Sequence, residues 1–173
     1  MTWPRCKRPA AFALTKSSRC ATNKARALLA AAWLGQLLCV ALMAAPNAFA
    51  TLARTEAGAY VGRLFWMDAR VSMLLGVLLL LVEQRRQRQQ HEGRVVFNRF
   101  LTLPAAAVFL AVLGYDALQP WMAQAKSGQA SASFALLHAA SLACFGAKAL
   151  VVAALAWASI TSCDSSAGKA SRA

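Results

Sequence analysis

Four long apolar stretches, separated by charged or Pro/Gly-rich segments, are the feature that most limits how this 173-residue chain can fold. We place them at residues 27–45, 64–82, 95–114 and 134–160. Each approaches the roughly 20 residues that a helix needs to cross about 30 Å of hydrocarbon. A soluble domain of this size has too little interior to surround four such helices. The sequence therefore predicts an all-α integral membrane protein, a four-helix bundle of transmembrane helices.

The charge of the chain first suggests nucleic acid as a partner, because the formal net charge is +13. However, the basic residues lie beside the apolar stretches, and Phe12 is the one aromatic residue within the basic clusters 5–26 and 85–94, which is too few for a base-stacking surface. Basic residues in that position are typical of cytoplasmic loops and of contact with anionic lipids. We therefore expect a lipid bilayer as the partner, with anionic lipid at the basic loops, and no nucleic acid.

The distribution of basic residues predicts an orientation. Thirteen of them lie in residues 1–26, 83–94 and 161–173, which share one side of a four-span chain, against three in the other two loops. This positive-inside bias places both termini in the cytoplasm, in a cell membrane that we take to be a bacterial inner membrane. We expect residues 1–26 and 161–173 to be disordered tails and residues 46–63 to form a short interfacial helix outside the bilayer.

The first apolar stretch also resembles a secretory signal, because a basic segment precedes it and Ala48-Phe49-Ala50 fits the A-x-A cleavage pattern. The stretch is longer than a signal's apolar region, and the basic segment is very long. We expect an uncleaved first span, with cleavage as the alternative.

The cysteines and the known catalytic motifs give little sign of chemistry. Five cysteines are an odd number without C-x-x-C spacing, so we expect neither a disulfide framework nor a zinc site. The chain lacks the nucleophile-elbow, phosphate-loop, zinc-protease and dinucleotide-binding motifs. We therefore expect no enzymatic activity, no metal and no cofactor.

Polar residues inside the spans are the candidates for a site, because each needs a partner or a water path. Counted at 1.5 Å per residue, Asp68 and His138 both lie about 6 Å below the outer starts of their spans. With Arg70 and Ser141 they form our candidate intramembrane polar site. Either the residues form a structural clasp, or the carboxylate orients the imidazole in a proton relay or a ligand site.

Lys148 lies about 21 Å from the outer face by the same count. That depth predicts that it is too deep to pair with Asp68, and groups it with Gln36 and Thr102 in an inner polar layer. Its ammonium group could snorkel to the cytoplasmic head groups, pair with Glu83 or bind an anion.

Short motifs follow one another along the spans in an order that resembles a known family. They are W-L-G at 33–35, A-P-x-x-F at 45–49, A-G-x-x-x-G-R-L-F at 57–65, Q-P-x-M at 119–122 and F-x-x-L-H-x-x-S at 134–141. This pattern resembles the transmembrane protein 205-like family, the domain of unknown function 4149, over residues 27–157. The resemblance implies a small four-helix multi-pass protein without an agreed biochemical activity, and it argues against cleavage after the A-P-x-x-F motif.

Two functions remain open from the sequence. The first is a non-enzymatic multi-pass protein that carries a small solute or supports a larger complex, with another membrane protein or a second copy as partner. The alternative is a haem- or copper-linked redox or resistance protein, because the layout more loosely resembles the copper-resistance D-like group. His138 and the scattered methionines are the residues that could bind such a group.

Overall fold

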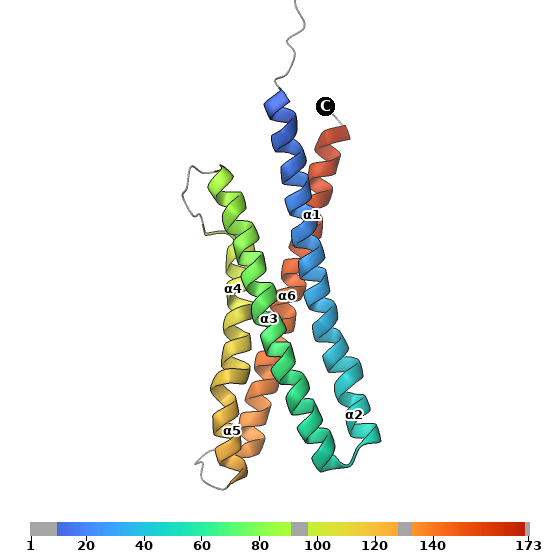
Figure 1. Ribbon diagram of the computed structural model, residues 1–173, viewed down its shortest axis with the longest axis vertical. Helices are drawn as coiled ribbons and strands as arrows, with labels where there is room; N and C mark the ends of the chain where they lie inside the picture. The colour runs from blue at the N-terminus through green and yellow to red at the C-terminus, as the bar shows by residue number, and fades with distance from the viewer. Residues whose placement is uncertain (1–9, 91–96, 128–132, 172–173) are drawn as a thin grey trace, which may run out of the picture.

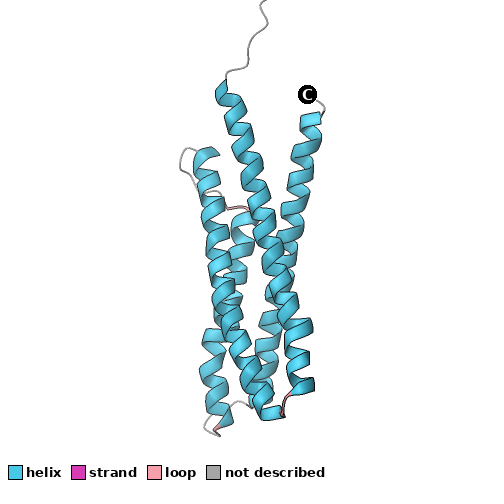
Figure 2. Ribbon diagram, turned by 45° about the vertical axis from the view of Figure 1, so that its right-hand side comes forward, coloured by secondary structure: helices cyan, strands magenta, loops and turns pink. Residues whose placement is uncertain are grey.

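The described part of the chain, residues 10–90, 97–127 and 133–171 of a computed structural model, contains helices and short connections only (Figure 2). The elements in chain order are α1 (Ala10–Cys39), the π-helical segment η1 (Val40–Ala44), α2 (Ala45–Thr51), α3 (Arg54–Gln90), α4 (Arg99–Ala111), the π-helical segment η2 (Val112–Ala117), α5 (Leu118–Lys126) and α6 (Phe134–Ser171). Four helical stretches are long and apolar enough to cross a membrane: Ala21–Thr51, Arg54–Arg88, Arg99–Ala125 and Phe134–Ser162. The predicted all-α fold with four membrane-spanning helices is confirmed.

The helices are longer than the apolar stretches that predicted them. Helix α3 begins at Arg54, so most of the segment expected as a separate interfacial helix is the first part of the second span. Its glycines, Gly58 and Gly62, each cost only about 1 kcal/mol in a helix interior and do not end it. Likewise, α1 begins at Ala10 and α6 ends at Ser171, so both helices extend into the segments expected as tails.

The four long helical columns form a ring in which α1 and α4 each pack against both α3 and α6. Consequently α3 and α6 are diagonal to each other, and they run in the same direction. We call the end where α1 starts and α6 ends the termini end, and the opposite end the far end. Figure 1 shows that α3 with α2 and α6 with α5 diverge towards the far end, where α3 and α5 do not pack against each other.

The apolar core fills the middle of the ring and its termini half. Its largest fully buried apolar side chains include Trp33 and Leu37 of α1, Leu79 of α3 and Leu155 of α6. Gly76 of α3 allows the closest approach, because a Cβ atom there would overlap the Val108 side chain on α4 and lie 3.2 Å from the Trp33 ring.

Both π-helical segments lie just before a proline. Segment η1 precedes Pro46, and η2 precedes Pro120. Proline lacks an N–H group and its ring clashes with the carbonyl four residues earlier, and a π-helical turn removes that conflict without ending the helix. The π turns therefore continue α1 into α2 and α4 into α5 without a break in the helix.

Candidate functional site: a far-end cavity closed by a buried ion pair

Asp68 of α3 is the centre of a buried polar cluster. Its Oδ2 accepts a 2.6 Å hydrogen bond from Lys148 Nζ on α6, and its Oδ1 accepts a 2.9 Å hydrogen bond from Gln36 Nε2 on α1. The side chains of the ion pair are only 4% and 2% exposed. Because both charged groups are buried away from water, removing either one would leave the other buried without its counter-charge.

Ser72 joins this cluster one turn further along α3. Its hydroxyl accepts a 3.1 Å hydrogen bond from Trp33 Nε1 and a 3.4 Å hydrogen bond from Lys148 Nζ. Residues three or four apart share a helix face, so Trp33 and Gln36 point from α1 to the same place as Asp68 and Ser72 from α3. We call Trp33, Gln36, Asp68, Ser72 and Lys148 the mid-bundle cluster.

The Asp68–Lys148 pair corrects the depth predicted from the sequence. Asp68 is the fourteenth residue after Arg54, the first residue of α3, and Lys148 is the fourteenth after Phe134, the first of α6. At 1.5 Å per residue both lie about 21 Å from the far end. The prediction that Lys148 is too deep for Asp68 was wrong because it started the second span at residue 64 and lost three turns of α3.

An aromatic pair covers the far-end side of the ion pair. Phe65 and Phe145, three residues before Asp68 and Lys148 respectively, meet edge to face with their ring centroids 5.3 Å apart. Lys148 Nζ also lies 4.8 Å from the centroid of the Phe145 ring. These side chains bridge two helices that are diagonal in the ring, so the ion pair and the two rings together close the space between α3 and α6.

A cavity of about 800 Å³ extends from this closure to the far end of the bundle. It lies between α2 and α3 on one side and η2, α5 and α6 on the other, and it reaches Arg54 and Phe134 at the helix starts. Alanine, glycine and large apolar side chains form most of its wall, while Asp68 and Lys148 line its inner end. The divergence of the two helix pairs therefore creates a chamber with an apolar wall and a charged inner end.

Of the four residues of the candidate polar site, Asp68, His138 and Ser141 line this cavity without forming one cluster, and Arg70 does not line it. His138 lines the cavity, but it is exposed and stacks on Phe134 with the ring centroids 5.7 Å apart. Among the described contacts of Asp68 and His138, the predicted hydrogen bond between them is absent. Asp68 lies ten residues further from the far end than His138, which is about 15 Å at 1.5 Å per residue.

Ser141 and Arg70 also have other partners. The Ser141 hydroxyl donates a 2.9 Å hydrogen bond to the Gly114 carbonyl of η2. Arg70 points outward and forms a 3.0 Å ion pair with Asp116, with 50% and 32% of the two side chains exposed. Both residues therefore connect η2 to its neighbours, α6 in one case and α3 in the other.

The predicted inner layer is brought together in part. Gln36 and Lys148 both bind Asp68, so they belong to one polar cluster as expected. Thr102 does not join them: it is exposed, and its hydroxyl donates a 3.2 Å hydrogen bond to the carbonyl of Asn98 in its own helix. Lys148 is buried against Asp68, and the snorkelling and Glu83 alternatives do not describe its position.

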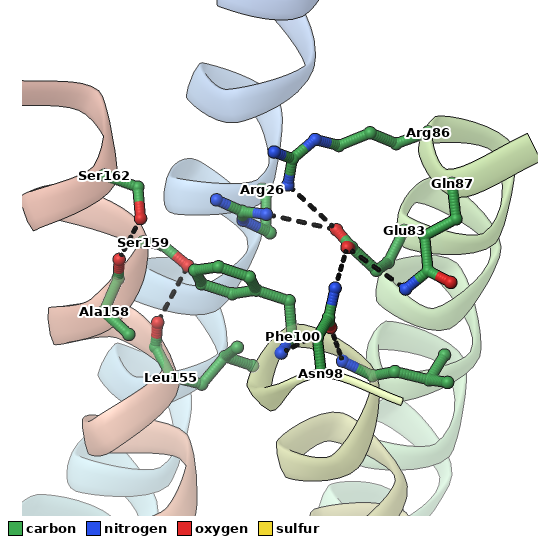
Figure 3. A network of polar contacts seen from close by, with 11 residues as sticks. Arg26, Glu83, Arg86, Gln87, Asn98, Phe100, Leu155, Ala158, Ser159 and Ser162 are labelled. Atoms are coloured by element: carbon green, nitrogen blue, oxygen red, sulfur yellow. Dashed lines mark hydrogen bonds and ion pairs between the residues drawn. The ribbon is translucent and has the colours of Figure 1, made fainter. Parts of the chain in front are cut away.

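A second polar network lies nearer the termini end, around Glu83 of α3 (Figure 3). One carboxylate oxygen of Glu83 accepts from Arg26 of α1 at 3.1 Å and from Arg86 at 3.4 Å. The other accepts from Asn98 at 2.9 Å and from Gln87 at 3.5 Å. We call these five residues the termini-end network; it connects α1, α3 and the start of α4.

Arg26 and Asn98 each have a second role in this network. The Arg26 guanidinium lies 3.6 Å from the centroid of the Phe100 ring, a cation–π contact inside the bundle. The Asn98 side chain is the N-cap of α4, and its Oδ1 accepts 3.0 Å hydrogen bonds from the backbone N–H groups of Phe100 and Leu101. The beginning of α4 is therefore fixed to Glu83 by the residue that caps it.

Sequence reasoning missed Trp33, Ser72 and Arg26 as site residues, and it treated Glu83 only as a partner for Lys148. A signal was available in the charge count, since the chain has only 6 acidic residues against 19 basic ones. Each acidic residue near a span is therefore a strong candidate for a buried ion pair. Among the described residues, no three His, Cys, Asp or Glu side chains gather as metal ligands.

The fold and the cavity define a multi-pass membrane protein whose four helices line an open cavity at the far end. Residues 28–131 match the family described as Domain of unknown function (DUF4149), and the chain belongs to this family. No curated protein and no solved structure matches the chain. The matched segment includes Gln36 and Asp68 but ends before α6, so His138 and Lys148 lie outside it.

Proposed function

We propose that the protein is a membrane carrier that takes a small molecule into the far-end cavity. The observation that carries this proposal is the buried Asp68–Lys148 ion pair at the inner end of the cavity. Ionisable residues inside a membrane are costly, and in multi-pass proteins they mark solute and ion pathways. A bundle that needed only stability would do as well with apolar side chains of similar volume at these two positions.

The size and wall of the cavity support a small molecule as the occupant. Ligand sites in proteins usually measure about 300–1,000 Å³ and have mainly apolar walls with a few placed polar groups. The far-end cavity, at about 800 Å³, has this character. Beside its inner end, the Gln36 Oε1 atom is buried and has no hydrogen-bond partner among the described residues, which leaves an acceptor for a ligand or water.

Two polar layers would act as barriers in such a carrier. The mid-bundle cluster separates the cavity from the core, and the termini-end network ties α1, α3 and α4 together beyond it. Carriers expose one binding site to each side in turn by moving one group of helices against another. The state described here is open to the far end, and exposure to the termini end requires both layers to separate.

The direction of transport follows from the orientation of the chain. We propose that both termini face the cytoplasm of a cell membrane, since thirteen basic residues lie on their side against three on the other. The far-end cavity then opens outward. The basic residues at the termini end contact anionic lipid head groups. A second copy or another membrane protein is a further partner consistent with a carrier of this size.

No observation favours the haem- or copper-linked alternative. His138 stacks on Phe134 at the exposed far end, and no group of metal-ligating side chains gathers around it among the described residues. The purified protein's visible absorption spectrum tests this alternative directly: a Soret band would support it, and the carrier proposal requires none.

The experiment that tests the proposal measures water access to the cavity. In a chain with its native cysteines replaced by alanine, Gly62→Cys places a thiol on the cavity wall, where a Cβ meets no neighbour. Leu74→Cys is the matched control, because it lies on α3 and is 60% exposed on the outer surface. A membrane-impermeant charged thiosulfonate reagent, added to sealed vesicles, should modify Gly62→Cys from the far-end side and leave Leu74→Cys unmodified. Equal modification of both thiols would contradict the proposed cavity.

A second arm tests the change of access. Glu83→Gln weakens the termini-end network, so Gly62→Cys should then also react from the side of the termini in part of the molecules. Arg70→Gln, which breaks the exposed pair with Asp116, should leave the access one-sided. One-sided access in both variants would show that the protein binds a molecule without carrying it.

A further inference from the structure

A shallow hollow adjoins the far-end cavity at the side of the bundle, between α3 and the η2–α5 segment. It is lined by Ala59, Gly62, Arg63, Trp66, Tyr115 and Gln119. Four of these six residues, Ala59, Gly62, Tyr115 and Gln119, also line the main cavity. The two spaces are therefore adjacent, and the side hollow lies on the outer surface of the bundle.

The packing of the helices explains why this side is open. The Ser141 hydroxyl binds the Gly114 carbonyl, and Gly114 lies so close to α6 that a Cβ atom would be 2.8 Å from the Cys144 Cβ. These contacts hold η2 against α6. On the opposite edge, Gly58 and Gly62 of α3 have no atoms within 4 Å of an added Cβ. The small residues of α3 thus leave an opening here in place of a helix contact.

The charge and polarity around the opening indicate what can enter it. Arg63 is exposed at the edge of the side hollow, and Arg54 lines the mouth of the cavity. A lipid-facing arginine reaches for the head-group region, and Trp and Tyr prefer the same level. Trp66 and Tyr115 line the hollow together with Arg63. The interior is apolar, and Asp68, the acidic residue in the described cavity wall, is already paired with Lys148.

We infer that the molecule taken into the cavity is an anionic amphiphile that enters sideways from the bilayer. Its acyl chain lies in the cavity against Phe65 and Phe145, and its anionic head group stays at Arg63. This inference rests on the proposed carrier function and names the class of its substrate. A fatty acid and an anionic phospholipid share this chemistry, so the experiment must distinguish them.

Photo-crosslinking of the purified full-length protein in phosphatidylcholine nanodiscs tests the inference. The probes are palmitic acid with a diazirine in its chain, phosphatidylglycerol with the same chain, and the uncharged hexadecanol analogue. Labelled residues are identified by mass spectrometry. We expect at least one acidic probe to label the inner wall around Phe65, Phe145 and Met122, and the alcohol to label it about tenfold less, as expected for one lost charge-assisted contact. The acidic probe that labels identifies the source.

Two variants with matched controls decide the outcome. Gly62→Leu places a side chain in the opening and should abolish labelling of the inner wall, while Gly35→Leu, a glycine on α1 with equally open space, should not. Arg63→Gln should reduce labelling by the acidic probe about tenfold, and Arg99→Gln, exposed near the start of α4, should not. Labelling confined to outward residues such as Leu74, or equal labelling by acid and alcohol, would overturn the inference. If Gly62→Cys still reacts with the aqueous reagent, the carrier proposal survives that result.

Discussion

Lys148 and Asp68 lie at the same distance along two parallel helices, and the 2.6 Å hydrogen bond between them crosses the diagonal of the bundle. The helices α3 and α6 are not neighbours in the ring. Among the described residues, this contact, the Lys148–Ser72 hydrogen bond and the Phe65–Phe145 edge contact join them. On the termini side of the pair the bundle is packed, and on the far side it divides into two arms. One ion pair therefore marks the boundary between the core and the cavity.

Removal of one member of this pair should destabilise the protein strongly. Lys148→Met leaves the Asp68 carboxylate buried, and Asp68→Asn leaves the ammonium group buried, at a cost of about 3–5 kcal/mol each. Asp68→Asn plus Lys148→Met should cost clearly less than the sum of the two, because neither charge is then stranded. Thermal unfolding in detergent measures all three variants.

The exposed pair between Arg70 and Asp116 is the control for this double-mutant cycle. Its side chains are 50% and 32% exposed, so Arg70→Gln should change stability by no more than about 1 kcal/mol. Strictly additive losses at Asp68 and Lys148 would show that the two charges do not interact in the folded protein.

His138→Ala should have little effect on stability, because the imidazole is exposed and its described contact is the stacked Phe134 ring. Combined with Asp68→Asn, its effect should be additive, since residues that far apart rarely couple. A coupling energy above about 0.5 kcal/mol would restore the interaction that the sequence suggested. The measurement is again thermal unfolding in detergent.

The sequence predicted the number of spans because the hydropathy of a membrane helix is a property of the helix alone. It did not predict their lengths. Because Arg54 and Glu56 at the start of α3 are polar, the hydropathy pattern did not include the first three helical turns of this span. Asp68 was therefore placed too close to the far end. Because the predicted start of the second span was wrong, His138 was predicted as the partner of Asp68 in place of Lys148.

The candidate site was found in part for a related reason. Asp68, Gln36 and Lys148 were recognisable because polar side chains inside a span need partners. Which partners they have depends on which helices are diagonal in the ring, and hydropathy carries no information about that. The bond from Ser141 to the Gly114 carbonyl was equally unpredictable, because it depends on how closely η2 packs against α6.

Two glycines of α3 should respond in opposite directions to substitution by alanine. Gly76→Ala places a methyl group against Val108 and Trp33 and should destabilise the protein by about 1–3 kcal/mol through overpacking. Gly62→Ala meets no neighbour, and its higher helix propensity should stabilise the protein by up to about 1 kcal/mol. Similar losses at both positions, measured as shifts in melting temperature, would mean that the far-end side of α3 is packed and the cavity absent.

Reporter fusions test the orientation. Fusions after Arg88 and after Gly168 should both behave as cytoplasmic, and a fusion after Lys126 should behave as external, because the basic residues gather at the termini end. External signals from the fusions after Arg88 and Gly168, with a cytoplasmic signal after Lys126, would show the opposite orientation. The cavity would then face the cytoplasm.

Asn98 offers the sharpest test of the termini-end network, because its two functions can be separated. Its Oδ1 caps α4 by accepting from Phe100 and Leu101, while its Nδ2 donates to Glu83 at 2.9 Å. Asn98→Ser keeps an N-cap acceptor and loses the reach to Glu83, whereas Asn98→Ala loses both. The alanine variant should be less stable than the serine variant by about 1 kcal/mol, the usual value of an N-cap.

The hydrogen bond to Glu83 accounts for the stability lost in Asn98→Ser, so that loss should depend on the residue at position 83. In a Glu83→Gln background the carboxylate that binds Arg26 and Arg86 is gone, so Asn98→Ser should cost less there than in the unaltered protein. The extra loss in Asn98→Ala should persist in both backgrounds, because capping does not involve Glu83. If Asn98→Ser costs the same in both backgrounds, Asn98 acts as a cap alone, and the termini-end network does not hold the start of α4 to α3.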